Sequence, residues 1–294
     1  MRKTYLTPAK LNIDIFAKSK AISILEGTYQ SIYKGKSQNF DQLREYNIGD
    51  NIRDIDWRAS ARSNNVLVKD YVAEKKHNIL FIMDGKYQMY ANANIDELKY
   101  DIAIDTVSTL SYVGYKNGEF IGSIYTTNKD IVYHPFRQNL FNIEHILKSY
   151  DEAMEKNYKK KDETSINKSL EYAINFIKRR MIVFIITDIV GLEEIDEDLL
   201  KTLSFRNDVM VISIKDIDLF EKKSYDLEKR RYFAPMLLHK KKLAKLEKEE
   251  KEKVFAEGEK KLIRNKASLI VIENSEEIVP KIVELLEKNR NMDL

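Results

Sequence analysis

The sequence predicts a mixed α/β fold in which a mostly parallel sheet is covered by helices on both faces. Two observations lead to this fold class. From about residue 77 onward, short apolar segments alternate with longer segments whose apolar residues recur at helical spacing. The short segments are almost continuously hydrophobic, as strands buried on both sides of a parallel sheet are. The 294 residues suffice for one large domain or two small ones.

The predicted elements follow one another in a regular order. A first strand covers residues 66–72, after the turn at Asn64 and Asn65. The strands of the main sheet are predicted at 78–83, 120–126, 131–133, 181–187, 209–214 and 268–272. The helices between and after them are predicted at 97–115, 141–154, 165–179, 197–203 and 276–288.

Two more helical segments lie outside this alternation. The first begins at Thr7 and Pro8 and ends at Gly27. The second, 240–266, is dense in lysine and glutamate, and we interpret it as an exposed, ion-paired helix; a nucleic-acid or membrane contact is the alternative. Its predicted ion pairs, four residues apart, are Glu247/Lys251, Glu249/Lys253 and Glu257/Lys261.

The chain therefore divides into an N-terminal segment and a sheet domain. The N-terminal segment covers residues 1–75 and combines a helix with strand-forming residues. The sheet domain covers 76–294 and contains a charged helical insertion near 222–266.

Composition narrows the classes of function. The formal net charge is only +3, so the chain as a whole has no electrostatic preference for nucleic acid or an anionic membrane. The absence of cysteine excludes disulfides, thiolate catalysis and cysteine-ligated metal centres. No apolar run approaches the ~20 residues of a membrane-spanning helix, and the first residues lack a signal-peptide pattern. We expect a cytoplasmic protein without membrane insertion.

Most catalytic motifs are missing. Gly35, Lys36 and Ser37 look like the end of a phosphate-binding loop, but Gln30 stands where that motif needs a glycine. No glycine-rich dinucleotide fingerprint follows any predicted strand. The histidines form no metal-binding or nucleophile–base motif, and we interpret them as surface or packing residues. They are His77, His134, His145 and His239.

Two aspartates stand at the ends of strongly apolar strands. Asp84 follows the strand 78–83, and Asp188 follows the strand 181–187. Ligands of open α/β sheets bind beyond the carboxyl ends of the strands, where the strand order reverses. With the hydroxyl of Thr164, these carboxylates offer oxygen ligands of the kind that Mg²⁺ prefers. The alternative is that each aspartate caps the helix that follows it.

The most distinctive stretch of the sequence is 44–62. It holds four arginines, four carboxylates and the only tryptophan within nineteen positions. Arginine matches carboxylates in bidentate geometry, so this composition predicts a fixed polar network around an aromatic ring. Its candidate interaction residues are Arg44, Glu45, Tyr46, Gly49, Asp50, Arg53, Asp56, Trp57, Arg58 and Arg62.

Residues 35–62, together with the strand at 66–74 and the strand end at Asp84, closely resemble the signature of a bacterial family called domain of unknown function 58. The resemblance implies a von Willebrand factor A-like sheet domain. It also implies a non-enzymatic adaptor role beside an AAA+ ATPase of the MoxR type, in the assembly or activation of a client protein.

The A-type domain's metal site reads Asp-x-Ser-x-Ser with a later threonine and a second aspartate. By this resemblance Asp84 matches the first aspartate, Thr164 the threonine and Asp188 the second aspartate, but Lys86 and Gln88 replace the serines. We expect the ammonium of Lys86 to lie between Asp84 and Asp188 in place of the metal, so that no cofactor binds. A bound Mg²⁺ is the alternative.

Three functions follow from these observations: a protein-interaction module, a metal-assisted hydrolase using Asp84 and Asp188, and a nucleic-acid binder using the lysine-rich helix. We favour the first. The signature has two interpretations. In one, Arg53, Arg58 and Arg62 pair with Asp50, Asp54 and Asp56, while Trp57 packs onto the sheet domain as an internal latch. In the other, part of the stretch is an exposed docking face. We place the latch slightly ahead.

Overall fold

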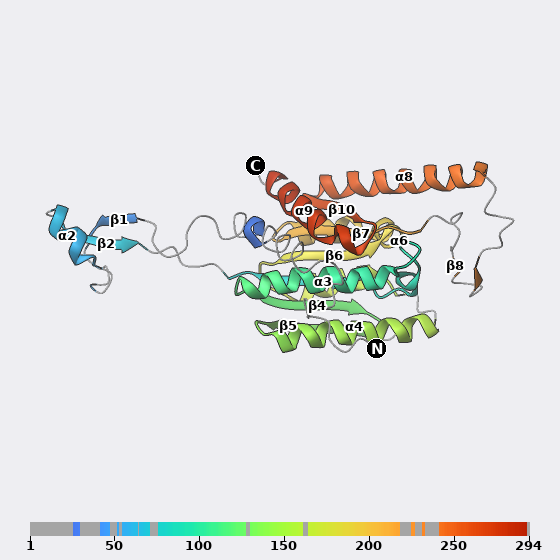
Figure 1. Cartoon of the computed structure of the whole chain (residues 1–294), viewed down its shortest axis with the longest axis horizontal. Coiled ribbons are helices and arrows are strands. Elements are labelled where there is room, and N and C mark those ends of the chain that lie inside the picture. The colour runs from blue at the N-terminus through green and yellow to red at the C-terminus, as the bar shows by residue number, and fades with distance from the viewer. Residues whose placement is uncertain are drawn as a thin grey trace.

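The fold is centred on one six-stranded sheet. The computed structural model describes residues 26–29, 42–47, 52, 55–63, 65–70, 76–127, 130–160, 164–217, 225–226, 231–232 and 241–292. The sheet consists of β3 (Asn78–Met83), β4 (Phe120–Thr126), β5 (Ile131–Arg137), β6 (Ile182–Asp188), β7 (Asp208–Ile214) and β10 (Ala267–Ile272). Figure 1 shows these strands stacked between helices. The predicted α/β class with a mostly parallel sheet is confirmed.

The strand order decides where a site can form. The order across the sheet is β10-β7-β6-β3-β4-β5, and every neighbouring pair is parallel except β4 with the edge strand β5. The chain therefore starts in the middle with β3, builds outward through β4 and β5, and then returns to the other side of β3 with β6. This is a doubly wound arrangement, and its strand order reverses between β3 and β6.

Helices cover both faces of the sheet. One face packs on α3 (Lys99–Lys116), α4 (Leu140–Lys160) and α9 (Ile278–Met292). The other packs on α5 (Ile166–Phe176), α6 (Ile189–Glu194), α7 (Glu197–Ser204) and α8 (Lys241–Arg264). Alternate residues of β3 divide between the two cores, Phe81 facing the first and Leu80 the second. This explains why the strands are apolar at nearly every position.

The structure differs from the sequence prediction at several boundaries. β5 extends to Arg137, beyond the predicted end at 133, because its last residues pair with β4. α5 ends at Phe176, earlier than predicted, and α6 was not predicted at all. Two short 3-10 helices, η4 (Tyr87–Tyr90) and η5 (Ser275–Glu277), and a small hairpin of β8 (Tyr225–Asp226) and β9 (Arg231–Tyr232) complete the described elements.

α8 confirms the predicted charged helix but changes its contacts. Two exposed pairs form, Lys245 with Glu249 and Lys248 with Glu252. Lys261, the predicted partner of Glu257, contacts backbone carbonyl groups instead. Its Nζ atom donates to the carbonyl oxygens of Leu192, Glu193 and Ile195, the last at 2.6 Å. Lysine near the last carbonyls of a helix satisfies groups that have no intrahelical partner. The second half of α8 is therefore attached to the end of α6.

The signature forms a small unit of its own. β1 (Gln42–Glu45) pairs antiparallel with β2 (Leu67–Asp70), and α2 (Trp57–Ser63) lies between them in the chain. This unit lies beyond the end of the six-stranded sheet in Figure 1. β2 falls within the predicted strand 66–72.

The chain before the signature unit is also tied to the sheet domain. Residues 26–29 are helical, so the helix predicted to end at Gly27 continues to Tyr29; its predicted start lies outside the described residues. Tyr29 is 2% exposed within the core that α3 and α4 share. Its hydroxyl donates to Oε1 of the buried Glu119, at 3.3 Å, and the backbone N–H of His77 donates to Oε2 of the same carboxylate. Part of the predicted N-terminal segment thus belongs to the core of the sheet domain.

Among the residues that the structure describes, no helix combines the length and apolar character needed to cross a membrane.

Tyr29→Ala tests this attachment. We expect it to lower the free energy of unfolding by about 3 kcal/mol, because it leaves a cavity where a large aromatic side chain is buried. Tyr29→Phe keeps the ring and removes only the hydrogen bond to Glu119, so its effect should be about 1 kcal/mol. Urea denaturation measures both. Equal and small losses would show that the ring adds nothing to the core.

Candidate functional site

The two predicted strand-end aspartates lie at the point where the strand order reverses. Asp84 follows β3 and Asp188 ends β6, and these strands are neighbours in the sheet. The backbone N–H of Asp84 donates to the carbonyl oxygen of Ile186, at 2.9 Å, which extends the pairing to the strand ends. Both aspartates are 1% exposed. The sequence therefore placed both aspartates correctly at the switch point of the sheet.

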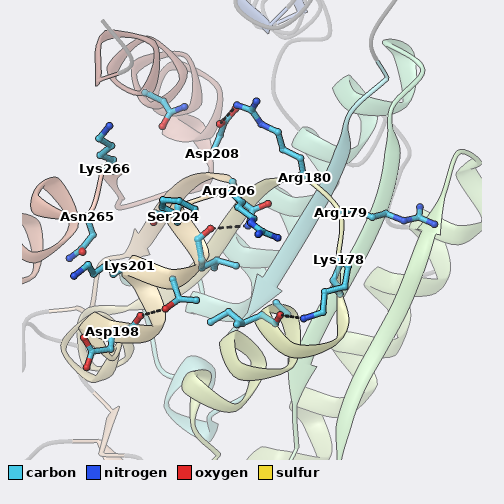
Figure 2. Close-up of a pocket in the computed structure, with 18 of the residues that line it drawn as sticks. Lys178, Arg179, Arg180, Asp198, Lys201, Ser204, Arg206, Asp208, Asn265 and Lys266 are labelled. Atoms are coloured by element: carbon cyan, nitrogen blue, oxygen red, sulfur yellow. Dashed lines mark hydrogen bonds and ion pairs between the residues drawn. The ribbon is translucent and has the colours of Figure 1, made fainter.

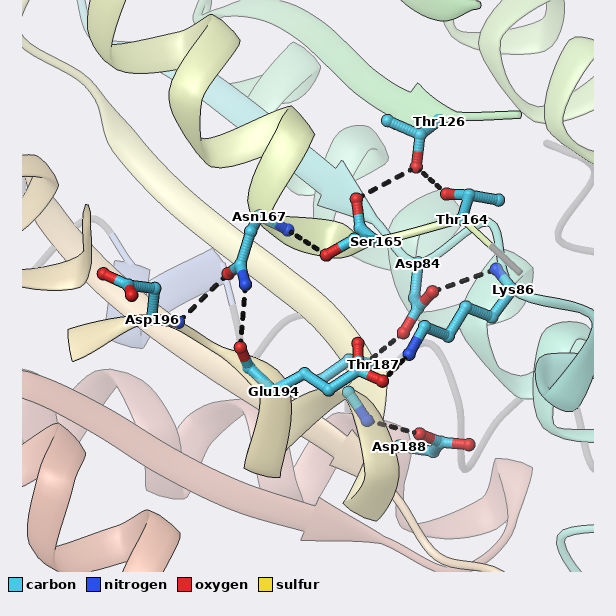
Figure 3. A network of polar contacts seen from close by, with 11 residues as sticks. Asp84, Lys86, Thr126, Thr164, Ser165, Asn167, Thr187, Asp188, Glu194 and Asp196 are labelled. Atoms are coloured by element: carbon cyan, nitrogen blue, oxygen red, sulfur yellow. Dashed lines mark hydrogen bonds and ion pairs between the residues drawn. The ribbon is translucent and has the colours of Figure 1, made fainter. Parts of the chain in front are cut away.

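Both oxygens of Asp84 already accept hydrogen bonds from the protein. The Thr187 hydroxyl donates to Oδ2 at 2.7 Å, and the backbone N–H of Lys86 donates to Oδ1 at 3.0 Å. Burial, followed by the negative charge of Asp188, raises the pKa of Asp84 to about 6. Asp84 is thus a buried carboxyl group whose two oxygens each accept a hydrogen bond from a nearby residue (Figure 3).

A buried lysine neutralises the second aspartate. Lys99 is the first residue of α3 and is 1% exposed. Its Nζ atom donates to Oδ2 of Asp188 at 2.5 Å and to Oδ1 of Asp216, which follows β7. Burial alone would lower the pKa of Lys99, but the charges of the two carboxylates outweigh it and raise that pKa above its ordinary value. Lys99 is therefore protonated at neutral pH.

Asp188 is held from a second side. Its Oδ1 atom accepts a hydrogen bond from the backbone N–H of Gly191, at 2.9 Å, so it caps α6 as the alternative prediction required. Burial opposes its ionisation, but the charge and hydrogen bond of Lys99 prevail and lower the pKa of Asp188. A side chain at Gly191 would collide with Thr187 and Asp84, so only glycine fits at this point.

The structure gives Lys86 a partner that the prediction did not name. Its Nζ atom pairs with Glu194 at the end of α6, while its positive charge also acts on Asp84 and Asp188. The ammonium that bonds Asp188 directly comes from Lys99. Gln88, at the other serine position, has a buried amide oxygen with no hydrogen-bond partner among the described residues. Neither residue joins the two aspartates.

Thr164 lies at the same edge of the sheet but is engaged elsewhere. It is 1% exposed, and its hydroxyl is hydrogen-bonded to the hydroxyl of Thr126 at the end of β4. Figure 3 shows Thr164 beside Thr126, with Asp84 and Lys86 nearby. The three residues predicted as metal ligands are thus gathered in one region, each with a protein partner.

These residues do not fit a Mg²⁺ ion. The cation requires several free oxygen ligands in octahedral geometry. Here one oxygen of Asp188 faces the ammonium of Lys99 and the other caps α6, while Asp84 accepts two hydrogen bonds. Within the described ranges, no three His, Asp or Glu side chains are grouped as metal ligands. The chemistry of this site is therefore charge compensation within the protein.

Three of the four histidines lie within the described residues, and each of them contacts another side chain. His77 contacts Glu119, with Nδ1 and Oε1 3.3 Å apart. His134 packs against His145, their ring centroids 5.0 Å apart, and burial followed by the charge of His145 lowers the pKa of His134 to about 4. His239 lies outside the described residues.

The described part of the signature is built around Asp56 and Ser60. Asp56 Oδ1 accepts hydrogen bonds from the backbone N–H groups of Arg58 and Ala59, both at 3.0 Å, and so caps the start of α2. The Ser60 hydroxyl accepts from the backbone N–H of Leu67 at 2.8 Å and donates to the carbonyl oxygen of Asp56 at 2.7 Å. These bonds attach α2 to β2.

β1 is tied to the start of β2 in the same way. The backbone N–H of Tyr46 donates to the carbonyl oxygen of Val66 at 2.8 Å, and Glu45 Oε1 accepts from Asn65 at 2.6 Å. Arg44 is half-buried in β1, where it pairs with Val68 in register. These contacts complete the described framework of the signature unit.

The predicted packing of Trp57 onto the sheet domain is wrong. Trp57 is 65% exposed, and Arg58 and Arg62 on the same helix are also exposed. Trp57 is the first residue of α2, and the hydrogen bonds that hold this helix come from Asp56 and Ser60, so they leave the indole ring in solvent. The signature residues Gly49, Asp50, Arg53 and Asp54 lie outside the described residues, so the ion pairs predicted for the last three stay predictions. The exposure of Trp57 agrees with the docking interpretation of the signature.

Comparison with known proteins assigns the chain. The sequence profile described as "Protein of unknown function DUF58" matches residues 42–221, which is more than half of the chain. The chain belongs to this family. The matched range contains both the signature unit and the switch-point aspartates.

Curated relatives of this DUF58 member are uncharacterised. "Uncharacterized protein Rv1480" of Mycobacterium tuberculosis (strain ATCC 25618 / H37Rv) and "Uncharacterized protein Mb1516" of Mycobacterium bovis are each 21% identical over 119 residues. The alignment covers 40% of this chain and 37% of each relative. The chain thus spans well under half the length of the curated relatives it matches.

Solved structures with a similar arrangement include two from Bacteroides. The hypothetical protein BatB from Bacteroides thetaiotaomicron aligns with a TM-score of 0.44 and 15% identity, covering 73% of this chain and 99% of that one. An aerotolerance-related membrane protein from Bacteroides fragilis aligns with a TM-score of 0.42 and 14% identity, over 72% and 99% of the two chains. The fold described above rests on the chain's own strand pairing.

Sequence reasoning missed Lys99 and Asp216, although both left a signal. Asp216 follows the apolar strand 208–214 closely, as Asp84 and Asp188 follow theirs. Lys99 stands at the start of a helix, where a positive charge opposes the helix dipole unless an anion faces it. A cation in this unfavourable position points to buried carboxylates nearby.

Lys99→Met tests the charge compensation. It leaves Asp188 and Asp216 without their cation, so we expect the free energy of unfolding at neutral pH to fall by about 3–5 kcal/mol. The loss should shrink as the pH falls. Without Lys99 the pKa of the buried Asp188 rises above its unfolded value, so the folded state then takes up a proton more readily than the unfolded chain. Urea denaturation at neutral and mildly acidic pH measures both effects.

The matched control is Lys159→Met, which removes an exposed lysine that pairs with Glu155 at 2.7 Å. Because that pair is fully exposed, its loss should leave the stability nearly unchanged. A Lys99→Met variant as stable as this control at neutral pH would contradict the role of Lys99.

Mg²⁺ should not stabilise the protein. A ligand that binds only the folded state raises the melting temperature, and each carboxylate oxygen of Asp84 and Asp188 is already engaged by a protein donor. Thermal unfolding with and without saturating Mg²⁺ is the measurement. An upward shift that disappears in Asp84→Ala would show that the ion displaces Lys99 and binds after all.

Proposed function

We propose that this DUF58 member is a non-enzymatic interaction module. Its signature unit docks onto an AAA+ ATPase of the MoxR type, and its von Willebrand factor A-like sheet domain links that ATPase to a client protein. The observation that carries the proposal is the exposure of Trp57, at 65%, on a short helix that also presents Arg58 and Arg62. Tryptophan and arginine dominate the binding energy of protein interfaces.

The anatomy of the signature unit supports a docking role. Its framework bonds, from Asp56 and Ser60 to the backbone, fix the direction of α2 without using Trp57. Ile52, at 65% exposure, adds a second large apolar side chain to the same unit. A protein that holds a large aromatic in water on a rigid element has an anchor ready for a partner.

The state of the switch-point aspartates counts against the alternative, a metal-assisted hydrolase. A raised pKa suits a general acid or base, and the pKa of Asp84 is raised. However, Asp84 and Asp188 are each 1% exposed and are occupied by Thr187, Lys86, Gly191 and Lys99. A substrate would have to displace these groups. The doubly wound sheet with both aspartates at its switch point supports the von Willebrand factor A-like assignment.

The partner is tested with a purified MoxR-type ATPase encoded in the same genome, using the tagged full chain as bait. We expect Trp57→Ala to weaken binding by at least about 10-fold, since a tryptophan anchor contributes 2 kcal/mol or more. Phe141→Ala is the matched control, because Phe141 is also a strongly exposed aromatic (82%), but lies on the sheet domain. It should bind like the unmodified chain.

Two outcomes would contradict the proposal in different ways. If the ATPase binds Trp57→Ala and the unmodified chain equally, the signature is not the docking face. If no binding occurs with either chain, the MoxR partnership is wrong. Both variants should keep the melting temperature, because both side chains are exposed, so unfolding cannot explain a loss of binding.

A further inference from the structure

A basic groove opens at the amino-terminal edge of the sheet, opposite the edge that carries Asp84 and Asp188. It has a volume of about 1490 Å³ and is lined by the loops that enter β6, β7 and β10, with the ends of α5 and α7 (Figure 2). Parallel strands place their amino ends at one edge, so three loops far apart in the sequence meet there. The groove is thus a product of the topology.

Positive charge converges on this groove. Seven lysine or arginine residues line it, against two aspartates. Arg179 and Arg180 come from the loop before β6, Arg206 from the loop before β7 and Lys266 from the turn before β10, and all four side chains are exposed. One aspartate, Asp208, pairs with Arg180 at 3.5 Å. The local excess of cations is larger than the net charge of +3 of the whole chain.

Lys266 adds a separate indication. Its φ angle is +54°, a left-handed conformation that usually selects glycine or asparagine at the end of a helix. A lysine there costs on the order of 1 kcal/mol relative to glycine. Lys266 thus adds a cation to the lining of the groove at a position where glycine would be more stable.

The groove also offers apolar contacts. Ile174, Ile177 and Leu203 contribute to its lining. A smaller hollow of about 260 Å³ shares Ile177, Lys178 and Arg179 with the groove and is bordered by aromatic side chains. In that hollow the rings of Tyr172 and Phe176 have centroids 4.9 Å apart. Phe176 is 70% exposed. The basic groove and the aromatic hollow therefore form one continuous surface.

We propose that this groove binds an acidic segment of a partner protein, with an apolar or aromatic anchor residue of that segment in the hollow beside Phe176. The carboxylates of the segment pair with the exposed arginines and Lys266, and the anchor gains the burial that an aromatic hollow provides. The surface is separate from the signature unit, so this proposal does not depend on the docking of Trp57.

The shape of the surface favours a peptide over the other polyanions. A bilayer surface is flat, whereas these cations line a concave groove whose lining is partly aliphatic. Single-stranded nucleic acid binds through bases stacked on a series of exposed rings, whereas of the four rings that border the hollow only Phe176 is exposed. An acidic segment with one apolar anchor uses both parts of the surface.

The test uses the full chain and a fluorescein-labelled synthetic peptide of glutamate and aspartate residues with one central phenylalanine. Fluorescence anisotropy measures the affinity. Arg180→Glu combined with Arg206→Glu should weaken binding at least about 10-fold, as should high salt. Lys245→Glu combined with Lys248→Glu changes the net charge equally on exposed positions of α8 and should bind like the unmodified chain.

A second comparison does not depend on the folding of any variant. Replacing the peptide's phenylalanine with alanine should weaken binding to the unmodified chain, and a lysine version of the peptide should not bind. Equal binding of the acidic and lysine peptides, or equal losses in the two double variants, would overturn the proposal. Tighter binding of oligothymidylate or of phosphatidylserine vesicles, lost in Arg180→Glu with Arg206→Glu, would also overturn it and assign the groove to nucleic acid or membrane.

Discussion

The arrangement at the switch point of the sheet depends on one buried ammonium group, that of Lys99. Three aspartates, Asp84, Asp188 and Asp216, follow neighbouring strands, and the first two are completely buried. Lys99 reaches from α3 to the ends of β6 and β7 and compensates Asp188 and Asp216 at once. A buried charge without a partner is strongly unfavourable, so the helix and the strand ends are required to stay together. The switch point is therefore a structural joint between α3 and the ends of β6 and β7.

The sequence allowed the strands and the location of this joint to be predicted, because continuous apolar runs and the aspartates after them are local features. The cation could not be assigned in the same way. Lys86 was expected there because it stands at a serine position of the A-type metal motif, yet its side chain reaches Glu194, while Lys99 arrives from the next helix. Trp57 shows the same limit. Its composition suggested burial, but exposure depends on whether another element covers α2.

Net charge gave an incomplete prediction for a related reason. A total of +3 hides the fact that cations collect at the amino-terminal edge while carboxylates collect at the opposite edge. The basic residues come from three separate loops, and only the parallel arrangement of β6, β7 and β10 brings them together. Sequence-wide averages therefore describe solubility better than they describe the surfaces that a fold creates.

The contacts of Glu119 have a mechanical consequence for the signature unit. Tyr29, before the unit, and His77, after it, both bind the carboxylate of Glu119, which lies between α3 and β4. The chain segments before and after the signature unit are therefore bound to the sheet domain at the same carboxylate, that of Glu119. A partner that pulled on α2 would therefore act on the sheet domain through both Tyr29 and His77. We expect such tension to be borne at the α3–β4 corner, leaving the Lys99 joint at the other end of the strands undisturbed.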